Sequence, residues 1–231
     1  MRWSVLGLGV LALACGEESV ESEDVRTTGI YPEIQVTATG NGNSQVRVRL
    51  KVGGSDSNTF LDLTGDDTLE ATVDGETKTL DETDDETYTA SFAVDAEGTE
   101  FSIAFLRGDD NDSAPESTVS LPAPFTLSLD ATEYSRGNDA IAVSWDPAGT
   151  GNMAWDIEGD CIKSDDGSVP DDGTHTFAAG SIETFESDAE ESCTVDLRLT
   201  RSQAGGVDPA FTEGGRIVAR QVRSDSFTSA P

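Results

Sequence analysis

The chain has 231 residues, enough for one large or two ordinary domains, and its 45 acidic and 14 basic residues give a formal net charge of −31. This acidity excludes a nucleic-acid binder and disfavours docking onto anionic lipid headgroups, because both roles need a basic surface. The single histidine, His175, excludes a metal centre built from several histidines. Short, regular apolar runs and 23 glycines predict a folded, β-rich protein.

The N-terminus has the features of an export signal, because Arg2 is followed by an apolar stretch at residues 5–14. This stretch is too short to cross a bilayer, which takes about 20 residues. The run Ala12-Leu13-Ala14-Cys15 resembles the lipobox of bacterial lipoproteins. That resemblance implies that residues 1–14 are cleaved and that Cys15 receives a lipid. The alternative is an ordinary secretory signal followed by a chance cysteine.

The three cysteines support export with lipidation. If Cys15 carries a lipid, Cys161 and Cys193 remain as one pair. An exported protein folds in an oxidising compartment, so we expect a disulfide between these two residues. In the chain-entropy model such a crosslink stabilises the fold by ~3 to 4 kcal/mol.

Residues 15–24 are predicted to be the lipidated cysteine and a solvated acidic tether, since residues 16–24 carry five acids and no base. Beyond the tether, apolar and polar side chains alternate repeatedly, as in half-buried strands. The segments with this pattern are 34–39, 46–52, 69–73, 77–80, 88–94, 101–105 and 119–121. Many short strands separated by turns are typical of a β-sandwich.

Pro122 and Pro124 interrupt the chain, and we place the domain boundary there, giving sandwiches at residues 25–122 and 123–231. A second set of strand patterns follows, at 125–129, 141–145, 153–157, 175–178, 195–199 and 217–222. Successive side chains of a strand point to opposite faces. Cys193 shares its parity with Val195 and Cys161 with Ile157, so both thiols are expected to point inward.

The segment IAVSWDPAGTGNMAWDI at residues 141–157 resembles fibronectin type III and other immunoglobulin-like domains. Cys193 in a later strand, and the lack of a tyrosine corner there, depart from that family. The wider layout resembles a group of Gram-negative bacterial lipoproteins with tandem immunoglobulin/fibronectin-III-like domains. This second resemblance rests on the lipobox, STVSLPAPFTL, CTVDLRLTR and RIVARQVRS. It implies an all-β fold of two tandem immunoglobulin-like β-sandwich domains in the cell envelope, and no particular chemistry.

No catalytic residue is predicted. A Ser-His-Asp site needs a base that accepts a proton near neutral pH, and His175 is the sole candidate. It lies in a strand-like segment, and the chain has no G-x-S-x-G nucleophile elbow. A hydrolase with a carboxylate pair is an alternative, but among 45 acids no pair is singled out.

The densest acidic cluster follows Gly108 and contains the Ca²⁺ candidates Asp109, Asp110, Asn111 and Asp112. Residues 109–115 resemble the calcium-binding linker of cadherins, which implies Ca²⁺ binding as part of an adhesin-like module. The companion D-R-E motif is missing, and a strand pattern continues after the cluster. We therefore expect a solvated hairpin loop and no cofactor, with Ca²⁺ binding as the alternative.

Residues 198–223 have the opposite charge to the rest of the chain, since they contain five arginines and two acids. The arginines are Arg198, Arg201, Arg216, Arg220 and Arg223. A second basic stripe contains Arg47, Arg49 and Lys51. These stripes predict a docking surface for an acidic envelope protein or for a second copy of the chain. The alternative is cross-strand pairing with local acids, which stabilises a fold little.

Together these patterns predict an exported protein, anchored in the bacterial outer membrane by the lipid and facing the periplasm or the exterior. Its expected role is that of a non-catalytic interaction or structural module.

Overall fold

The computed structural model describes residues 18–231 apart from 84–85, 109–111, 186 and 188–189. In the described residues the secondary structure consists of 18 strands and two short 3₁₀ helices. The strands form three sheets that enclose two separate apolar cores. The prediction of an all-β fold with two β-sandwiches is confirmed.

The elements before Pro122 belong to the first sandwich. They are β1 (Glu18–Glu21), η1 (Ser22–Asp24), η2 (Thr27–Gly29), β2 (Ile30–Ala38), β3 (Ser44–Val52), β4 (Thr59–Asp62), β5 (Thr68–Val73), β6 (Glu76–Thr79), β7 (Asp81–Glu82), β8 (Tyr88–Phe92), β9 (Glu100–Leu106) and β10 (Ala114–Ser120).

The elements after Pro124 build the second sandwich and return to the first. They are β11 (Thr126–Leu129), β12 (Glu133–Ser135), β13 (Ile141–Asp146), β14 (Asn152–Gly159), β15 (Asp165–Pro170), β16 (Thr174–Phe177), β17 (Cys193–Ala204) and β18 (Arg216–Ala230).

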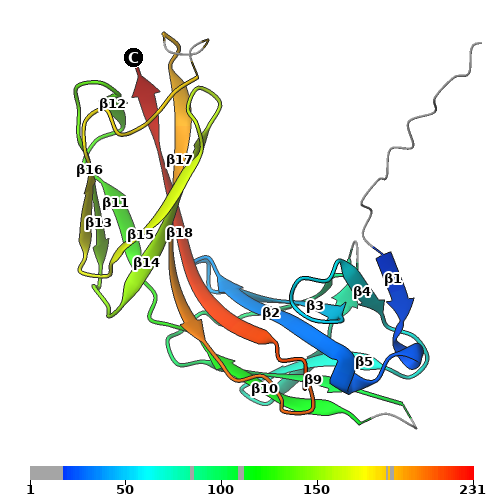
Figure 1. Cartoon of the computed structure of the whole chain (residues 1–231). Helices are drawn as coiled ribbons and strands as arrows, with labels where there is room; N and C mark the ends of the chain where they lie inside the picture. Colours follow the sequence, from blue (N-terminus) through cyan, green and yellow to red (C-terminus); the bar gives the residue numbers. More distant parts are fainter. Residues whose placement is uncertain (1–17, 84–85, 109–111, 186, 188–189) are drawn as a thin grey trace, which may run out of the picture.

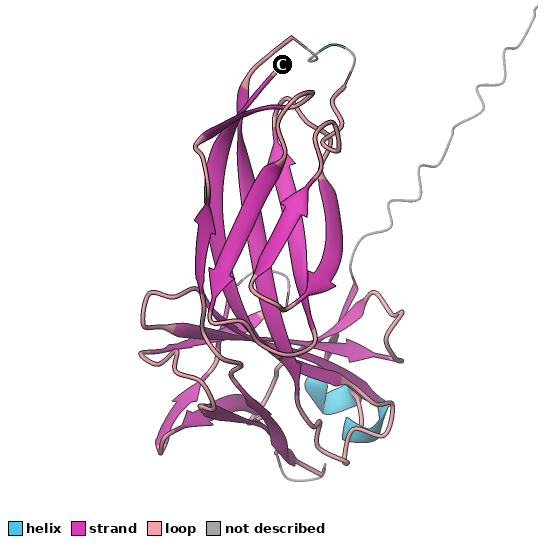
Figure 2. Ribbon diagram, turned by 90° about the vertical axis from the view of Figure 1, so that its left-hand side faces the viewer, coloured by secondary structure: helices cyan, strands magenta, loops and turns pink. Residues whose placement is uncertain are grey.

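One eleven-stranded sheet, which we call the shared sheet, passes through both sandwiches. Eight of its strands follow the order β1-β4-β3-β2-β18-β17-β14-β15, while β8 pairs with β3, β7 with β8, and β12 with β18. The first part of β18, residues 216–221, pairs in parallel with β2 of the first sandwich. Along residues 218–229, β18 also pairs antiparallel with β17. Figure 1 shows β18 bending as it runs from the first sandwich to the second, and Figure 2 shows the same long strands from the side.

Each sandwich is closed by a smaller sheet. The four-stranded sheet β10-β9-β5-β6 lies across the first core, and the three-stranded sheet β11-β13-β16 lies across the second. The first core contains the edge-to-face pair Phe92 and Phe101, with ring centroids 5.8 Å apart. The second core contains Trp145, Met153 and Ile157. Alternating strand patterns place these side chains inside and their polar neighbours outside.

The last part of the chain contributes to both cores, which differs from the expected division at Pro122. Phe211, Ile217 and Ala219 are buried in the first core, while Phe227 is buried in the second. The prediction assigned all of residues 123–231 to the second sandwich. The difference arises because β18 is long enough to span both sandwiches and pairs with β2 before it reaches the second.

The predicted acidic tether is wrong for residues 18–24, which are part of the first sandwich. β1 pairs in parallel with β4, and Val20 packs against the first core. Ser22 is fully buried, and its backbone carbonyl accepts a hydrogen bond of 2.7 Å from Arg107. Glu18 and Glu21 remain exposed, so this strand buries its few apolar groups and leaves its charges in water.

Candidate docking surface on the shared sheet

The five arginines predicted to form one stripe divide by strand parity. On β17 and β18 the residues Leu197, Leu199, Ile217 and Ala219 are buried in the cores. Arg201 shares the parity of Leu199, and Arg223 that of Ala219, so both lie on the inner face. The arginines with the opposite, outward parity are Arg198, Arg216 and Arg220.

Arg201 is a structural residue and not part of a docking surface. Its guanidinium holds the carboxylate of Asp171 with two hydrogen bonds, of 2.6 Å from Nε and 2.8 Å from Nη2. It also donates to the backbone carbonyls of Ala123 and Pro147, at 2.8 Å each. Trp145 Nε1 donates to the same carboxylate at 2.7 Å. The prediction for Arg201 is therefore wrong, because the ion pair is buried in the second sandwich.

Charge pairing sets the ionisation of Asp171. Burial alone would raise the pKa of this carboxyl, but hydrogen bonds from Arg201 and Trp145 outweigh burial and hold the pKa below its ordinary value. A Cβ added at Gly149 would collide with the carboxylate of Asp171, so the backbone packs directly against this group. The surroundings therefore favour an ionised, fully paired Asp171.

Arg223 is also removed from the predicted surface. Its guanidinium lies 5.4 Å from the ring centroid of Phe125 and donates to the carbonyl of Val222 at 2.8 Å and to Oε1 of Gln221 at 3.2 Å. Gly40 in the neighbouring turn has a φ of +81°, which favours glycine, and a Cβ there would lie 2.7 Å from this guanidinium. Burial lowers the pKa of Arg223 from its ordinary value. These contacts make it a packing residue between the two sandwiches.

The three outward arginines lie on the same face of the shared sheet as the second basic stripe. β2 separates the two groups, with Glu33 opposite Arg49 on one side and Arg216 on the other. Gln35 is likewise opposite Arg47 of β3. We call the resulting surface the arginine face; it consists of Arg47, Arg49, Lys51, Arg198, Arg216 and Arg220.

Two hollows open on the arginine face. The smaller, of about 50 Å³, is lined by Glu33, Gln35, Arg47, Arg49, Arg216 and Arg220. The larger, of about 450 Å³, lies where the two sandwiches meet and is lined by Gln35, Thr37, Arg198, Thr200, Ser202 and Arg220, with Asp156 at its side. Arg220 lines both hollows and therefore lies at their junction.

Several cations of the arginine face have partners. Glu33 accepts from Lys51 and Arg216, each with an N–O distance of 3.3 Å. Arg198 lies 3.1 Å from the carboxylate of Asp156. The predicted alternative, pairing with local acids, is therefore realised for these three cations.

Arg220 differs from these cations. Its Nε is buried and has no hydrogen-bond partner among the described residues. Burial, and then the nearby charge of Arg216, lower the pKa of Arg220 from its ordinary value. Arg220 is thus a partly desolvated guanidinium beside two open hollows, and such a group gains most from an added anion.

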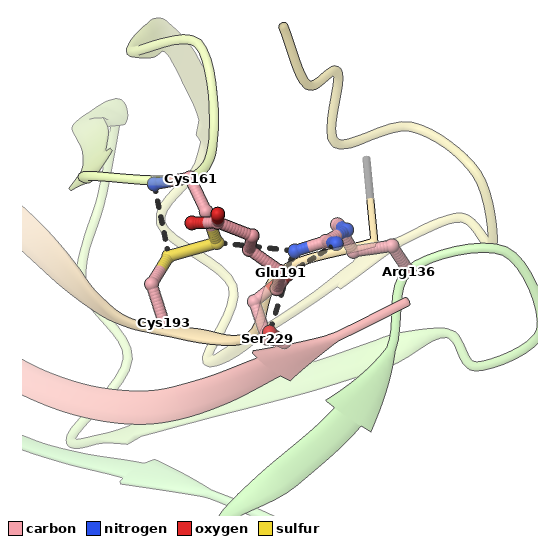
Figure 3. The surroundings of a disulfide bond; sticks show 5 residues. All are labelled: Arg136, Cys161, Glu191, Cys193 and Ser229. Carbon is pink, nitrogen blue, oxygen red and sulfur yellow. Dashed lines mark hydrogen bonds between the residues drawn. A yellow bond between two sulfur atoms is a disulfide. The ribbon is translucent and has the colours of Figure 1, made fainter. Parts of the chain in front are cut away.

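The disulfide is confirmed: Cys161 and Cys193 are bonded, with their Cα atoms 5.7 Å apart. It joins the segment after β14 to the start of β17 (Figure 3). Arg136 donates to Sγ of Cys161 at 3.1 Å and to the carbonyl of Glu191 at 2.6 Å. The crosslink and this buried arginine together fix one end of the second sandwich.

The Ca²⁺ candidates Asp109, Asp110 and Asn111 lie outside the described residues. Asp112 is exposed, and its carbonyl accepts a hydrogen bond of 2.5 Å from the hydroxyl of Thr27. In the part of the chain that the structure describes, no three metal-binding side chains of His, Cys, Asp or Glu come together. Ca²⁺ binding stays an untested prediction.

Two other predicted features are located as follows. His175 lies in β16, where its ring packs edge-to-face on Phe177 at a centroid distance of 4.7 Å. Cys15, the predicted lipid site, lies outside the described residues. Within the residues described, no helix has the length and apolar character needed to cross a membrane.

Comparison with known proteins finds similar solved structures. No family model and no curated protein matches the chain. A two-domain fibronectin type III segment of chicken tenascin is 11% identical, covering 85% of this chain and 97% of its own, with a TM-score of 0.24. The fibronectin(III)-like modules of Clostridium thermocellum CbhA are 12% identical, covering 86% and 89%, with a TM-score of 0.30. The human OSCAR ligand-binding domain is 11% identical, covering 85% and 97%, with a TM-score of 0.27. At these TM-scores the fold assignment rests on the strands and cores described above.

Proposed function

We propose that the protein is a lipid-anchored, non-catalytic interaction module of the bacterial cell envelope, which presents the arginine face to an acidic partner. One observation carries this proposal: six cations gather on one face of a sheet in a chain with 45 acids and 14 bases. Local complementarity of this kind guides orientation and partner choice more than it adds raw affinity.

The shared sheet supports a role in presentation. β17 and β18 are paired over twelve residue positions, and β18 also pairs with β2. Both sandwiches therefore contribute side chains to the larger hollow without a flexible linker between the contributing strands. A surface built on paired strands keeps its geometry better than one built on loops.

The anchor supports a position close to the membrane. Only Gly16 and Glu17 separate Cys15 from β1. An extended chain spans at most about 3.6 Å per residue, so a lipid on Cys15 holds the first sandwich within about 11 Å of the lipidated residue. The several acyl chains of a bacterial lipoprotein are enough for stable anchoring, whereas one chain binds only weakly. We place the protein in the outer membrane, facing the periplasm or the exterior.

The anchor is tested by expressing the full chain in a Gram-negative host with a labelled fatty acid. The wild type should incorporate the label and sediment with membranes, whereas Cys15→Ala should lose both properties because the acylated thiol is gone. Thr39→Ala, an exposed substitution on the first sandwich, serves as control and should behave like the wild type. A Cys15→Ala chain that is still labelled and membrane-bound contradicts the proposed anchor.

A further inference from the structure

The two hollows that meet at Arg220 differ from the rest of the arginine face because they combine open space with an unpartnered, buried donor atom. We propose that these hollows bind an extended acidic polypeptide segment, whose carboxylates pair with Arg220 and with Arg47 across β2. This inference rests on the proposed function and names the chemical class of the partner.

The spacing of the face suits an extended chain. Arg47 and Arg220 lie on the strands either side of β2, whose outward side chains between them are Gln35 and Thr37. Neighbouring strands are about 4.8 Å apart, so β3 and β18 are separated by about 9.6 Å. A segment laid over β2 would therefore have a neutral floor with a guanidinium on each side. Alternate side chains of an extended ligand repeat about every 6.8 Å, the same interval that separates Arg47 from Arg49.

The energetic argument centres on Arg220. Its Nε has already lost water on folding and has gained no hydrogen bond from the described residues in return. A bound carboxylate would pair with this under-satisfied guanidinium and relieve repulsion between Arg220 and Arg216. Arg198 should contribute less to binding a carboxylate, because its guanidinium is already paired with Asp156.

The lining favours a polypeptide over a phosphate polymer. Glu33 and Gln35 in the smaller hollow, and Asp156 beside the larger one, bring hydrogen-bond acceptors close to the cations. A polypeptide offers backbone N–H donors to these acceptors as well as carboxylates to the arginines. A phosphate polymer has only acceptors and cannot donate a hydrogen bond to Glu33 or Asp156. A second copy of the chain is disfavoured because two bodies of charge −31 repel each other.

The test measures binding of a fluorescent peptide of alternating Glu and Thr to the detergent-solubilised full chain at low salt. The control peptide has Gln in place of Glu. Arg220→Gln should weaken binding of the acidic peptide about 10-fold or more, and Arg47→Gln by about 5-fold, as expected for lost charge-assisted hydrogen bonds. Arg26→Gln removes one positive charge at an exposed position outside the arginine face, and it should alter binding less than about 2-fold. Thermal unfolding checks that each variant is folded.

Several results would overturn the inference: no binding by the wild type, equal binding of both peptides, or an Arg220→Gln effect no larger than that of Arg26→Gln. Stronger competition by inorganic polyphosphate than by the peptide would assign the hollows to a phosphate polymer. A dimer that Arg220→Gln dissociates in sedimentation would assign them to a second copy. These results are independent of the Cys15→Ala experiment, so the anchor and the ligand can fail separately.

Discussion

Each sandwich contains a buried arginine–aspartate pair, and the two pairs hold different parts of the chain. In the first, Nε of Arg107 lies 2.9 Å from Oδ2 of Asp67. The rest of this guanidinium binds the N-terminal segment, donating to the carbonyls of Ser22 at 2.7 Å and Val25 at 3.1 Å. In the second, Arg201 donates to the carbonyl of Ala123, which lies in the connection between the sandwiches. Asp171 accepts a hydrogen bond from the indole of Trp145. The first pair thus fixes a terminal segment, and the second fixes the middle of the molecule.

This difference separates local from global stability. The backbone carbonyls held by Arg107 precede β2, and their segment can detach while the remaining sheet pairs persist. The residues held by Arg201 belong to β17 and to the connection between the sandwiches, so they cannot separate without disturbing the shared sheet. Breaking the first pair should therefore mainly loosen the N-terminal segment, whereas breaking the second should lower the stability of the whole fold.

The largest effect is expected for Arg201→Met, which leaves Asp171 buried without its cation. Removing one partner of a buried ion pair costs about 3–5 kcal/mol. In a chain of this length the loss should lower the thermal midpoint by roughly 10 °C. Urea unfolding followed by tryptophan fluorescence measures the free energy, because Trp145 and Trp155 are both in the second sandwich.

Two further variants make this comparison sharper. Adding Asp171→Asn to Arg201→Met should recover part of the stability, since no buried charge is then left unpaired. Arg198→Met lies on the same strand with outward parity and serves as matched control. An Arg201→Met chain as stable as Arg198→Met would show that the buried pair is unimportant.

The same pair predicts a dependence on acid. The pKa of Asp171 in the folded protein lies below the ordinary value of 3.8, so the unfolded chain binds the proton more readily. The contribution of the pair is complete above about pH 5 and is lost as pH falls through 3.8 toward the folded pKa. The difference in unfolding free energy between wild type and Asp171→Asn should therefore shrink between pH 6 and pH 3. A difference independent of pH over this range would contradict the assignment.

Parity within the strands was sufficient to separate these arginines. Cys193, Val195, Leu197 and Leu199 define the inward positions of β17, and Arg201 continues the series. The same rule applied to Ile217 and Ala219 places Arg223 inside. Grouping the five arginines by charge alone concealed this division. The disulfide, in contrast, was correctly predicted because cysteine number and parity gave the same answer.

Strand pairing over long sequence distances could not be predicted. The alternating pattern of β18 predicts which of its side chains point inward, but it does not predict which strand lies beside it. The parallel pairing with β2 joins residues more than 180 positions apart in the sequence. Likewise, five acids in residues 16–24 indicate a solvated segment, whereas β1 forms because β4 offers an edge and Arg107 binds the carbonyl of Ser22. Both features depend on tertiary partners that local composition does not reveal.

A smaller effect is expected when Arg107→Met is combined with Asp67→Asn, so that no buried carboxylate is left without its cation. The variant loses hydrogen bonds to the carbonyls of Ser22 and Val25, each a charge-assisted bond worth about 1.5–3 kcal/mol. Because the segment can detach locally, the urea midpoint should fall less than in Arg201→Met. Trypsin cleavage after the exposed Arg26 should accelerate several-fold, and mass spectrometry identifies the site. Unchanged cleavage at Arg26, or a loss of global stability equal to that of Arg201→Met, would contradict the local role.

The smallest effect is expected for the surface pair Arg198 and Asp156 on the arginine face. Burial raises the pKa of Asp156, and Glu158 and Asp166 act in the same direction against Arg198. A carboxyl with a raised folded pKa is less favourable when ionised in the folded state than in the unfolded state. Asp156→Asn should therefore leave stability unchanged or slightly higher, whereas Arg198→Gln should lower it slightly.

A double-mutant cycle of the two substitutions measures their coupling, which should be below about 1 kcal/mol at low salt and should decrease further as salt is added. The cycle also bears on the proposed ligand site. If Asp156 weakly occupies Arg198, as this small coupling implies, Asp156→Asn exposes one more guanidinium in the larger hollow and should tighten binding of the acidic peptide. A coupling of several kcal/mol would instead make this pair a structural element comparable to Arg201 and Asp171, and would remove Arg198 from the arginine face.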